Sequence, residues 1–298
     1  MKRWQVDSTL LVVVMLWGST FFVVHDATSL WPPVAFVALR FGLASLALLP
    51  WVLRSMGQWT SADVRAGIIL GLLLTAGYIS QTIGISLTTA SRSGFITGLN
   101  VVMVPLIGAL LLRTKVRGQV WVGVLLAVAG LLVLSLDNGG ADAKSSWLGD
   151  GLVFLCAITF AGHILAVGHW SRGRSLVAIN FIQMATVAVL AAIGSLLFEP
   201  APTMPVAAVW WAALYLGVIC TALLLAIQVV AQRYASPTHT AMIFVLEPVF
   251  AALFAAMFGG ETLTMLLIWG GLLMMSGIVL AELPPLGRKV AGVVAGDQ

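Results

Sequence analysis

The sequence predicts an all-α integral membrane protein whose ten transmembrane helices form two inverted five-helix repeats, with both termini in the cytoplasm. Three observations predict this fold: an apolar composition, ten separate apolar stretches, and a spacing of residues that recurs in the two halves. Of the 298 residues, 60% are hydrophobic and only 9% are charged, and the mean hydropathy is +1.06. Soluble proteins carry about 25% charged residues, so this chain lacks the polar side chains that a water-facing surface requires.

Apolar stretches long enough to cross a bilayer, which takes about 20 residues each, follow one another with short connections. The first one comes after Lys2 and Arg3, as in a signal peptide, but Trp17-Gly18-Ser19 is a poor cleavage site, so we expect an uncleaved span. No soluble domain fits between the stretches. The expected spans are residues 8–26, 34–53, 66–88, 94–112, 119–137, 149–170, 175–197, 207–231, 238–258 and 262–282.

Basic residues gather on one side of this expected topology. With the N-terminus inside, the cytoplasmic side receives twelve of them and the outer side receives only Arg92 and Lys144. This bias predicts cytoplasmic termini, and it accounts for the net charge of +4 without nucleic acid as a partner. The cytoplasmic residues are Lys2, Arg3, Arg54, Arg65, Arg113, Lys115, Arg117, Arg172, Arg174, Arg233, Arg288 and Lys289.

The two halves of the chain resemble each other in spacing. Gln81 and Gln228 lie 147 positions apart, and so do Gly130 and Gly277. Because a repeat of five helices is odd, its second copy enters the membrane from the opposite side. Inverted repeats are typical of secondary transporters, whose substrate site lies near the midplane between the halves. We therefore expect a first repeat over residues 1–137, a second over 138–282, and a cytoplasmic tail over 283–298.

The ninth expected span contains an acid followed by a helix breaker, Glu247 and Pro248. Pro248 cannot donate a backbone hydrogen bond and would leave the carbonyl of Phe244 free, so we expect the helix to break there. Val104-Pro105 is the counterpart in the first repeat, which makes Pro105 and Pro248 the predicted structural breaks. Glu247 has no acidic counterpart. We expect it to bind a substrate ammonium group or to carry a proton, with capping of freed backbone donors or pairing with a neighbouring helix as the alternative.

Other polar and aromatic side chains also lie within the expected spans. Tyr78 and Gln81 are three residues apart and share a helix face, and His163 lies one turn from Thr159. A pseudo-two-fold axis would bring Gln81 and Gln228 to one cavity, although amides also serve as contacts between helices. The predicted substrate-binding residues are Trp17, Tyr78, Gln81, Asn100, Thr159, His163, Thr221, Gln228 and Glu247, and Glu247 and His163 are also the candidates for proton coupling.

The remaining features have structural interpretations. Arg40 is the only basic residue within a span, and we expect it to snorkel or to pair with an acid such as Asp26. The pairs Gly67–Gly71 and Gly94–Gly98 predict close helix packing. Glu261 is expected in an external turn.

Three segments carry a resemblance to a known family. "WGSTFF" in the first span, "ALRFGLASLALLP" in the second and "LEPVFAALFAAMFGGETLT" in the ninth resemble the drug/metabolite transporter superfamily, in particular its EamA-type exporters. Amino-acid exporters of the YddG type are the most similar branch. The resemblance implies a ten-helix inverted repeat in a bacterial inner membrane and export of small metabolites. The family often has Gly-Glu where this chain has Arg113-Thr114-Lys115, so no role is carried over to those positions.

The function predicted from these features is secondary export of small amphipathic metabolites by alternating access, first of all aromatic or apolar amino acids. There is no Walker A sequence, and we expect no enzymatic activity, cofactor or metal. Export of cationic drugs is the alternative. A channel, or an intramembrane protease using Ser86 of "GISL" with His163, are more distant ones. The expected partners are the small-molecule substrate and the lipid bilayer, and the expected unit is a monomer.

Overall fold

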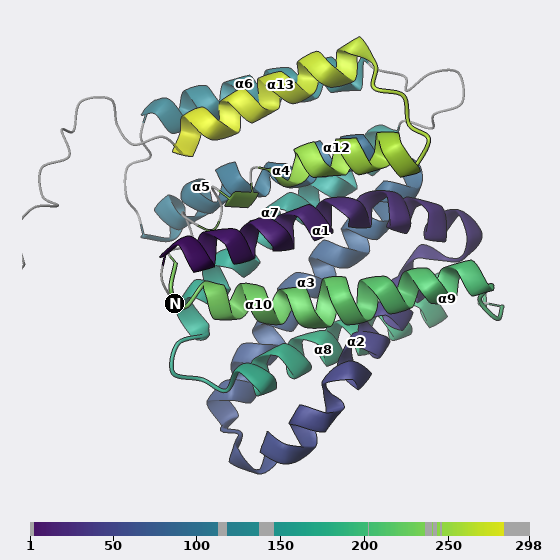
Figure 1. The fold of residues 1–298 in the computed structure, drawn as a ribbon, viewed down its shortest axis with the longest axis vertical. Coiled ribbons are helices and arrows are strands. Elements are labelled where there is room, and N and C mark those ends of the chain that lie inside the picture. The colour runs from purple at the N-terminus through teal and green to yellow at the C-terminus, as the bar shows by residue number, and fades with distance from the viewer. Residues whose placement is uncertain are drawn as a thin grey trace, which may run out of the picture.

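The protein is a bundle of helices (Figure 1). The computed structural model describes residues 3–112, 118–136, 146–201, 203–235, 240, 243–244 and 246–282, and it contains no β-strand within these ranges. The expected tail and Arg113-Thr114-Lys115 lie outside the described residues. The helices are α1 (Arg3–Leu30), α2 (Pro33–Ser55), η1 (Met56–Gln58), α3 (Ser61–Leu87), α4 (Ala90–Gly98), α5 (Asn100–Leu112), α6 (Gly118–Ser135), α7 (Trp147–Trp170), α8 (Leu176–Phe198), α9 (Ala207–Leu214), η2 (Tyr215–Leu223), α10 (Leu224–Ala231), α12 (Glu247–Phe258) and α13 (Met265–Glu282).

Seven helical stretches in the described part of the chain are long and apolar enough to cross a membrane. Three shorter apolar helices, Gly118–Val133, Glu247–Phe258 and Met265–Ala281, lie in the other three expected spans. The prediction of an all-helical, multi-pass membrane protein is therefore confirmed. The seven long stretches are Trp4–Leu30, Pro33–Gln58, Ser61–Leu87, Ala90–Leu111, Trp147–Trp170, Leu176–Phe198 and Ala207–Ala231.

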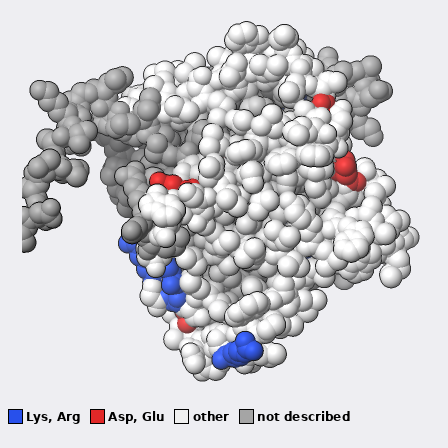
Figure 2. Space-filling view, viewed as in Figure 1, with Lys and Arg blue, Asp and Glu red and all other residues white. Residues whose placement is uncertain are grey.

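The surface of the bundle is suited to lipid. Figure 2 shows a broad face almost free of charged groups, with Lys and Arg gathered toward the end that carries the N-terminus. Large apolar side chains project from the helices, among them Leu53, Leu110 and Phe198, which is 86% exposed. A soluble protein rarely exposes so much contiguous apolar surface, whereas a bilayer covers it at no cost.

Glycines allow several helices to pack at short range. Gly94 and Gly98 of α4 lie against Ala251 and Pro248 of α12, and neither position has room for a Cβ atom. Gly67 and Gly71 make the same kind of contact between α3 and α8. Both glycine pairs therefore set helix packing, as their spacing predicts.

A second set of glycines joins α6 to α13, which lie side by side (Figure 1). Gly123 approaches the backbone of Gly277, and Gly130 approaches the backbone of Gly270. Adding 147 to the residue number relates Gly123 to Gly270 and Gly130 to Gly277. The contact between Gly123 and Gly277 is therefore the counterpart of the contact between Gly130 and Gly270. An arrangement of this kind is expected where two similar units face each other across an axis.

The helix break that the sequence predicts at Pro105 lies at a different residue. The interruption falls at Leu99, between α4 and α5, whereas Pro105 lies inside α5. At Leu99 the backbone tightens, because its N–H donates to the carbonyl of Ile96 (3.1 Å) and its carbonyl accepts from Val102 (3.0 Å). Pro105 thus removes one backbone donor without ending the helix, and the prediction of a break at Pro105 is wrong. In the second half of the chain, α12 begins at Glu247 with Pro248 in its first turn, the position at which the break was predicted.

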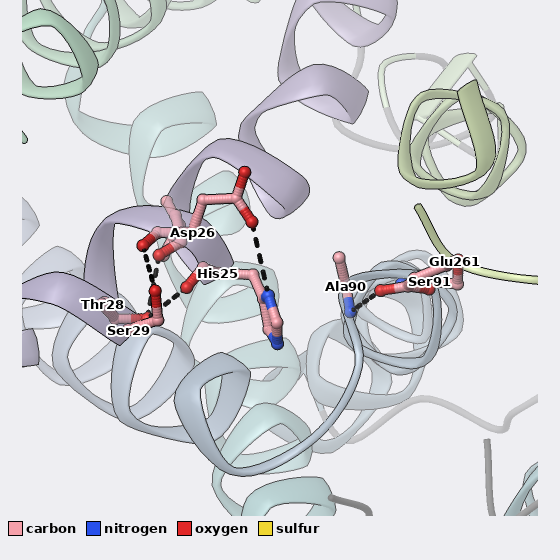
Figure 3. Close-up of polar contacts among 8 residues, drawn as sticks. His25, Asp26, Thr28, Ser29, Ala90, Ser91 and Glu261 are labelled. Atoms are coloured by element: carbon pink, nitrogen blue, oxygen red, sulfur yellow. Dashed lines mark hydrogen bonds and ion pairs between the residues drawn. The ribbon is translucent and has the colours of Figure 1, made fainter. Parts of the chain in front are cut away.

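An acid between α12 and α13 caps a helix far away in the sequence. The Glu261 carboxylate accepts hydrogen bonds from the backbone N–H groups of Ala90 (2.6 Å) and Ser91 (3.1 Å) at the start of α4 (Figure 3). Glu199 caps α2 in the same way, through Val34 and Ala35 (both 2.8 Å). The first N–H groups of a helix have no partner within it and favour a negative charge. Glu261, which the sequence predicts only as a residue of an external turn, therefore also caps α4.

We expect Glu261→Ala to lower the free energy of unfolding by about 1–2 kcal/mol, the usual loss on removing an N-terminal cap. Glu261→Gln should lose less, because its amide oxygen can still accept one of the two bonds. Thermal unfolding in detergent, with the exposed neighbour Thr262→Ala as control, measures both losses. Equal unfolding temperatures for Glu261→Ala and the control would show that the cap contributes nothing.

The N-terminal ends of α4 and α7 are joined by a buried ion pair. Arg92, which the topology expected from the sequence places on the outer side, is only 2% exposed and pairs with Asp150 in the first turn of α7. Asp150 also accepts a hydrogen bond from the hydroxyl of Thr88 (3.1 Å). Arg92 therefore belongs to the interior of the bundle.

Candidate functional site

A cavity of about 50 Å³ lies among α1, α2, α3, α5, α7, α10 and α12. Seven of the nine predicted substrate-binding residues line it, although they come from six different helices. The lining residues are Trp17, Thr20, Arg40, Leu74, Tyr78, Gln81, Asn100, Phe160, His163, Ile164, Leu225, Gln228, Phe244 and Glu247.

The two predicted residues that do not line the cavity are both threonines. The Thr159 hydroxyl donates to the carbonyl of Cys156 in its own helix (2.9 Å). Thr221 is fully buried and accepts a hydrogen bond from Nε of Arg40 (2.8 Å). Thr221 therefore positions a lining residue, and Thr159 has no contact with the cavity.

Glu247 lies at the break before α12, where the start of the helix turns its side chain into the cavity lining. The residue is 8% exposed, and no hydrogen bond or ion pair joins it to any residue that the structure describes. Two neutral acceptors that line the same cavity are also without a partner, Oδ1 of Asn100 and Oε1 of Gln228. Because buried polar atoms are nearly always hydrogen-bonded, three free acceptors around one cavity fit a ligand that donates.

Aromatic rings form much of the wall. Trp17 and Phe244 meet edge to face with their ring centroids 5.4 Å apart, and Tyr78 lies against Phe160 at 5.1 Å. The indole N–H of Trp17 donates to the carbonyl of Cys220 (2.9 Å), which fixes the ring. A rigid aromatic wall of this kind can hold an apolar or a cationic part of a ligand.

Arg40 lies inside the bundle, whereas its position in the sequence predicts snorkelling to the membrane surface or pairing with an acid. It is 3% exposed, its guanidinium carbon lies 4.8 Å from the ring centroid of Tyr78, and it lines the cavity. Asp26 is exposed at the end of α1 and lies beside His25 at 3.7 Å (Figure 3). The predicted pairing of Arg40 with Asp26 is therefore wrong, because Arg40 lies in the N-terminal half of α2 and lines the cavity inside the bundle.

A π-helical stretch, η2, receives the bonds from these lining residues. Trp17 binds the carbonyl of Cys220 and Arg40 binds Thr221, both within η2. At the start of η2, the Tyr215 hydroxyl is bonded to that of Ser19 (2.7 Å). π-Helical turns are rare and often occur at functional sites, and this one connects the cavity walls of α1 and α2.

His163 is held by a chain of amides that runs along α8. Its Nε2 lies 3.1 Å from Oε1 of Gln183, whose amide nitrogen donates to Asn180 (3.0 Å), which in turn donates to the carbonyl of Leu176 (2.9 Å). Since the Gln183 oxygen can only accept, His163 donates through Nε2. Asn180 and Gln183 could have been found in the sequence as amides three residues apart within one apolar span.

The serine of the protease alternative is not positioned for catalysis. The Ser86 hydroxyl donates to the carbonyl of Ile83 (2.8 Å), and His163 is bonded to Gln183. A nucleophile must lie within hydrogen-bond reach of its base. The pair that this alternative requires is therefore absent.

Sequence reasoning missed the apolar part of the lining. Leu74, Ile164 and Leu225 resemble every other aliphatic residue of a membrane helix, and Phe160 resembles any buried ring. No signal in the sequence separates the cavity face of such a helix from its packed faces. Among the described residues there is no group of three or more His, Cys, Asp or Glu side chains that could hold a metal ion.

Comparisons with known proteins identify the family. The profile of the EamA-like transporter family matches residues 5–136 and again residues 147–283. An uncharacterized transporter of Archaeoglobus fulgidus is 31% identical over 286 residues, which cover 95% of this chain and 87% of that protein. The uncharacterized inner membrane transporter YedA of Escherichia coli is 25% identical over 86% of this chain and 83% of its own length.

The fold has also been observed before. A protein of known crystal structure aligns with a TM-score of 0.68 and 21% identity, over 94% of this chain and 98% of that one. At this identity the likeness concerns the fold alone. Together with the two matches to the family profile and the relatives named as transporters, the sequence segments quoted above lead to one conclusion: this chain belongs to the EamA-like transporter family of the drug/metabolite transporter superfamily.

Proposed function

We propose that the protein is a secondary transporter that exports small amphipathic metabolites, in the first place amino acids with aromatic or apolar side chains. The observation that carries the proposal is the cavity, which combines the unpaired Glu247 carboxylate with an aromatic wall. A buried charge without a partner is costly. A substrate ammonium group at Glu247 would remove this cost while the substrate is bound.

Transport would proceed by alternating access between two inverted five-helix repeats. The two matches to the family profile divide the chain close to the proposed boundary between residues 137 and 138. The exchanged glycine contacts between α6 and α13 also support a pseudo-two-fold relation between the halves. In this arrangement the cavity lies at the interface of the repeats, where rocking of one half against the other exposes it to each side in turn.

The membrane and the orientation are part of the proposal. The name of the relative YedA places that protein in an inner membrane, and we propose the same location for this chain. The bias of Lys and Arg toward the end with the N-terminus supports cytoplasmic termini (Figure 2). We propose a monomer with a small-molecule substrate and lipid as its partners.

Export of hydrophobic cationic drugs is the second candidate. The same Glu247 carboxylate and aromatic rings would hold an organic cation. The two candidates differ in the substrate charge that the cavity must accept, which is zero for an amino acid and positive for a cationic drug.

A counterflow screen in proteoliposomes tests the proposal. Vesicles are loaded with single amino acids or with a cationic dye such as ethidium, and the entry of labelled phenylalanine is followed. We expect internal phenylalanine, leucine or methionine to accelerate entry, and ethidium to have no effect. Exchange supported by ethidium and by no amino acid would contradict the amino-acid proposal and favour the second candidate.

Glu247 and His163 are the proposed sites of proton coupling, because both are titratable and both line the cavity. Net flux under an imposed pH gradient measures the coupling. A rate that responds to the gradient supports it, and a rate that does not respond shows facilitated transport.

A further inference from the structure

Arg40 brings a permanent positive charge to the cavity. An arginine side chain stays protonated in proteins and offers five N–H donors in a planar fork. Its Nε donates to Thr221 at 2.8 Å. Among the described residues no acid lies within ion-pair distance of Arg40, and no hydrogen bond joins its two terminal nitrogens to the protein.

The surroundings of Arg40 fix its orientation. The bond to Thr221 holds one edge of the guanidinium, and the ring of Tyr78 lies 4.8 Å from its central carbon. The terminal N–H groups are left without an acceptor in a residue that lines the cavity. A paired set of N–H donors in one plane matches the two oxygens of a carboxylate.

The other free polar atoms of the cavity have the opposite character. Glu247, Oδ1 of Asn100 and Oε1 of Gln228 are acceptors without a partner. An ammonium group, which only donates, satisfies acceptors of this kind. The cavity therefore presents one unsatisfied set of donors and one unsatisfied set of acceptors, together with apolar and aromatic side chains.

We propose that Arg40 binds the carboxylate of the substrate while Glu247, Asn100 and Gln228 bind its ammonium group, so that the site selects zwitterionic α-amino acids. This inference rests on the proposed function and makes it narrower. Arg40 then becomes the specificity-determining residue that separates amino acids from amines and cationic drugs. The aromatic wall of Tyr78, Phe160 and Phe244 receives the side chain.

The selection follows from the cost of an unpaired charge. An amine without a carboxylate would occupy the cavity and leave Arg40 without water and without an anion. A site that hydrogen-bonds a polar group of its substrate strongly rejects analogues that lack this group. An apolar pocket rejects an analogue that lacks one methylene only weakly. We expect discrimination of at least tenfold.

Competition by substrate analogues on the unmodified protein tests the inference without any change to the fold. The counterflow of labelled phenylalanine is measured against phenylalanine, phenylalaninamide, phenethylamine and 3-phenylpropanoate. We expect the two compounds without a carboxylate and the one without an ammonium group each to compete at least tenfold more weakly than phenylalanine. Phenethylamine that competes as well as phenylalanine would overturn the role of Arg40.

Substitutions separate a binding role from a structural one. In Arg40→Gln we expect phenylalanine to compete at least tenfold more weakly while phenethylamine changes less than twofold. Arg40→Lys keeps the charge without the fork and should give an intermediate result. Arg54→Gln, an exposed arginine of the same helix, is the matched control. Equal weakening of both ligands in Arg40→Gln would mean that Arg40 only supports the fold.

The experiment also distinguishes this inference from the proposed function. If amino acids are exchanged but phenethylamine is exchanged equally well, amino-acid export stands and the role of Arg40 fails. If no amino acid is exchanged while ethidium is, the proposed function fails and the inference fails with it.

Discussion

Glu247→Gln should abolish most of the amino-acid exchange while the protein still folds. The substitution removes an ionisable carboxyl group that is buried in the cavity lining, and it retains nearly the same shape. Because no described residue depends on Glu247 for a hydrogen bond, the change leaves no protein group without a partner. A hydrogen bond to a charged group contributes about 1.5–3 kcal/mol, so we expect exchange to fall by about 10- to 100-fold.

The measurement is phenylalanine counterflow in proteoliposomes, with the amount of reconstituted protein and its unfolding temperature measured in parallel. Glu247→Asp keeps the charge and should retain part of the rate. Asp26→Asn, which removes an exposed carboxylate outside the cavity, is the matched control and should behave as wild type. A Glu247→Gln protein that exchanges phenylalanine at the full rate would contradict a binding role for Glu247.

The same variant distinguishes ammonium binding from proton transport. Exchange of one amino acid for another moves no net proton, whereas flux driven by a pH gradient does. If Glu247 served only as a proton carrier, Glu247→Gln would retain counterflow and lose only the response to the gradient. We expect both to be lost, because the carboxylate is needed for the substrate to bind.

Arg92→Met should produce the largest loss of stability. Arg92 and Asp150 are 2% and 6% exposed, and removal of one partner leaves the other as an unpaired buried charge. Such losses amount to about 3–5 kcal/mol. Thermal unfolding in detergent measures the effect, and Arg54→Met, at an exposed position of α2, is the control.

The double variant Arg92→Met/Asp150→Leu shows whether the loss comes from the unpaired charge. Replacement of a whole buried ion pair by apolar residues is often neutral, so we expect the double variant to regain most of the stability that Arg92→Met loses. A double variant as unstable as the sum of the two single ones would show that the two side chains act independently.

The helical fold and much of the cavity lining were predictable from the sequence for a simple reason. Membrane spans are long apolar stretches, and a polar residue such as Gln81 or Asn100 is conspicuous within them. Such a residue is expected to lie at an interface between helices or beside a cavity. Glu247 is conspicuous for a second reason, since Pro248 marks a helix start that would otherwise be invisible.

The contacts between distant helices could not be predicted in the same way. A helix that is apolar on every face carries no periodic signal of which face points inward. The sequence therefore could not place Arg40 on the cavity, or pair Arg92 with Asp150. Nor could it show that Glu261 would cap α4, because each of these contacts depends on how two helices are rotated against each other.

A structure determined at saturating phenylalanine tests the central claim most directly. We expect the amino acid in the cavity, with its carboxylate at Arg40, its ammonium group at Glu247 and its ring against Tyr78 and Phe160. Phenylalanine bound instead in the apolar groove lined by Leu48, Trp51 and Val218, with the cavity free of it, would contradict the account.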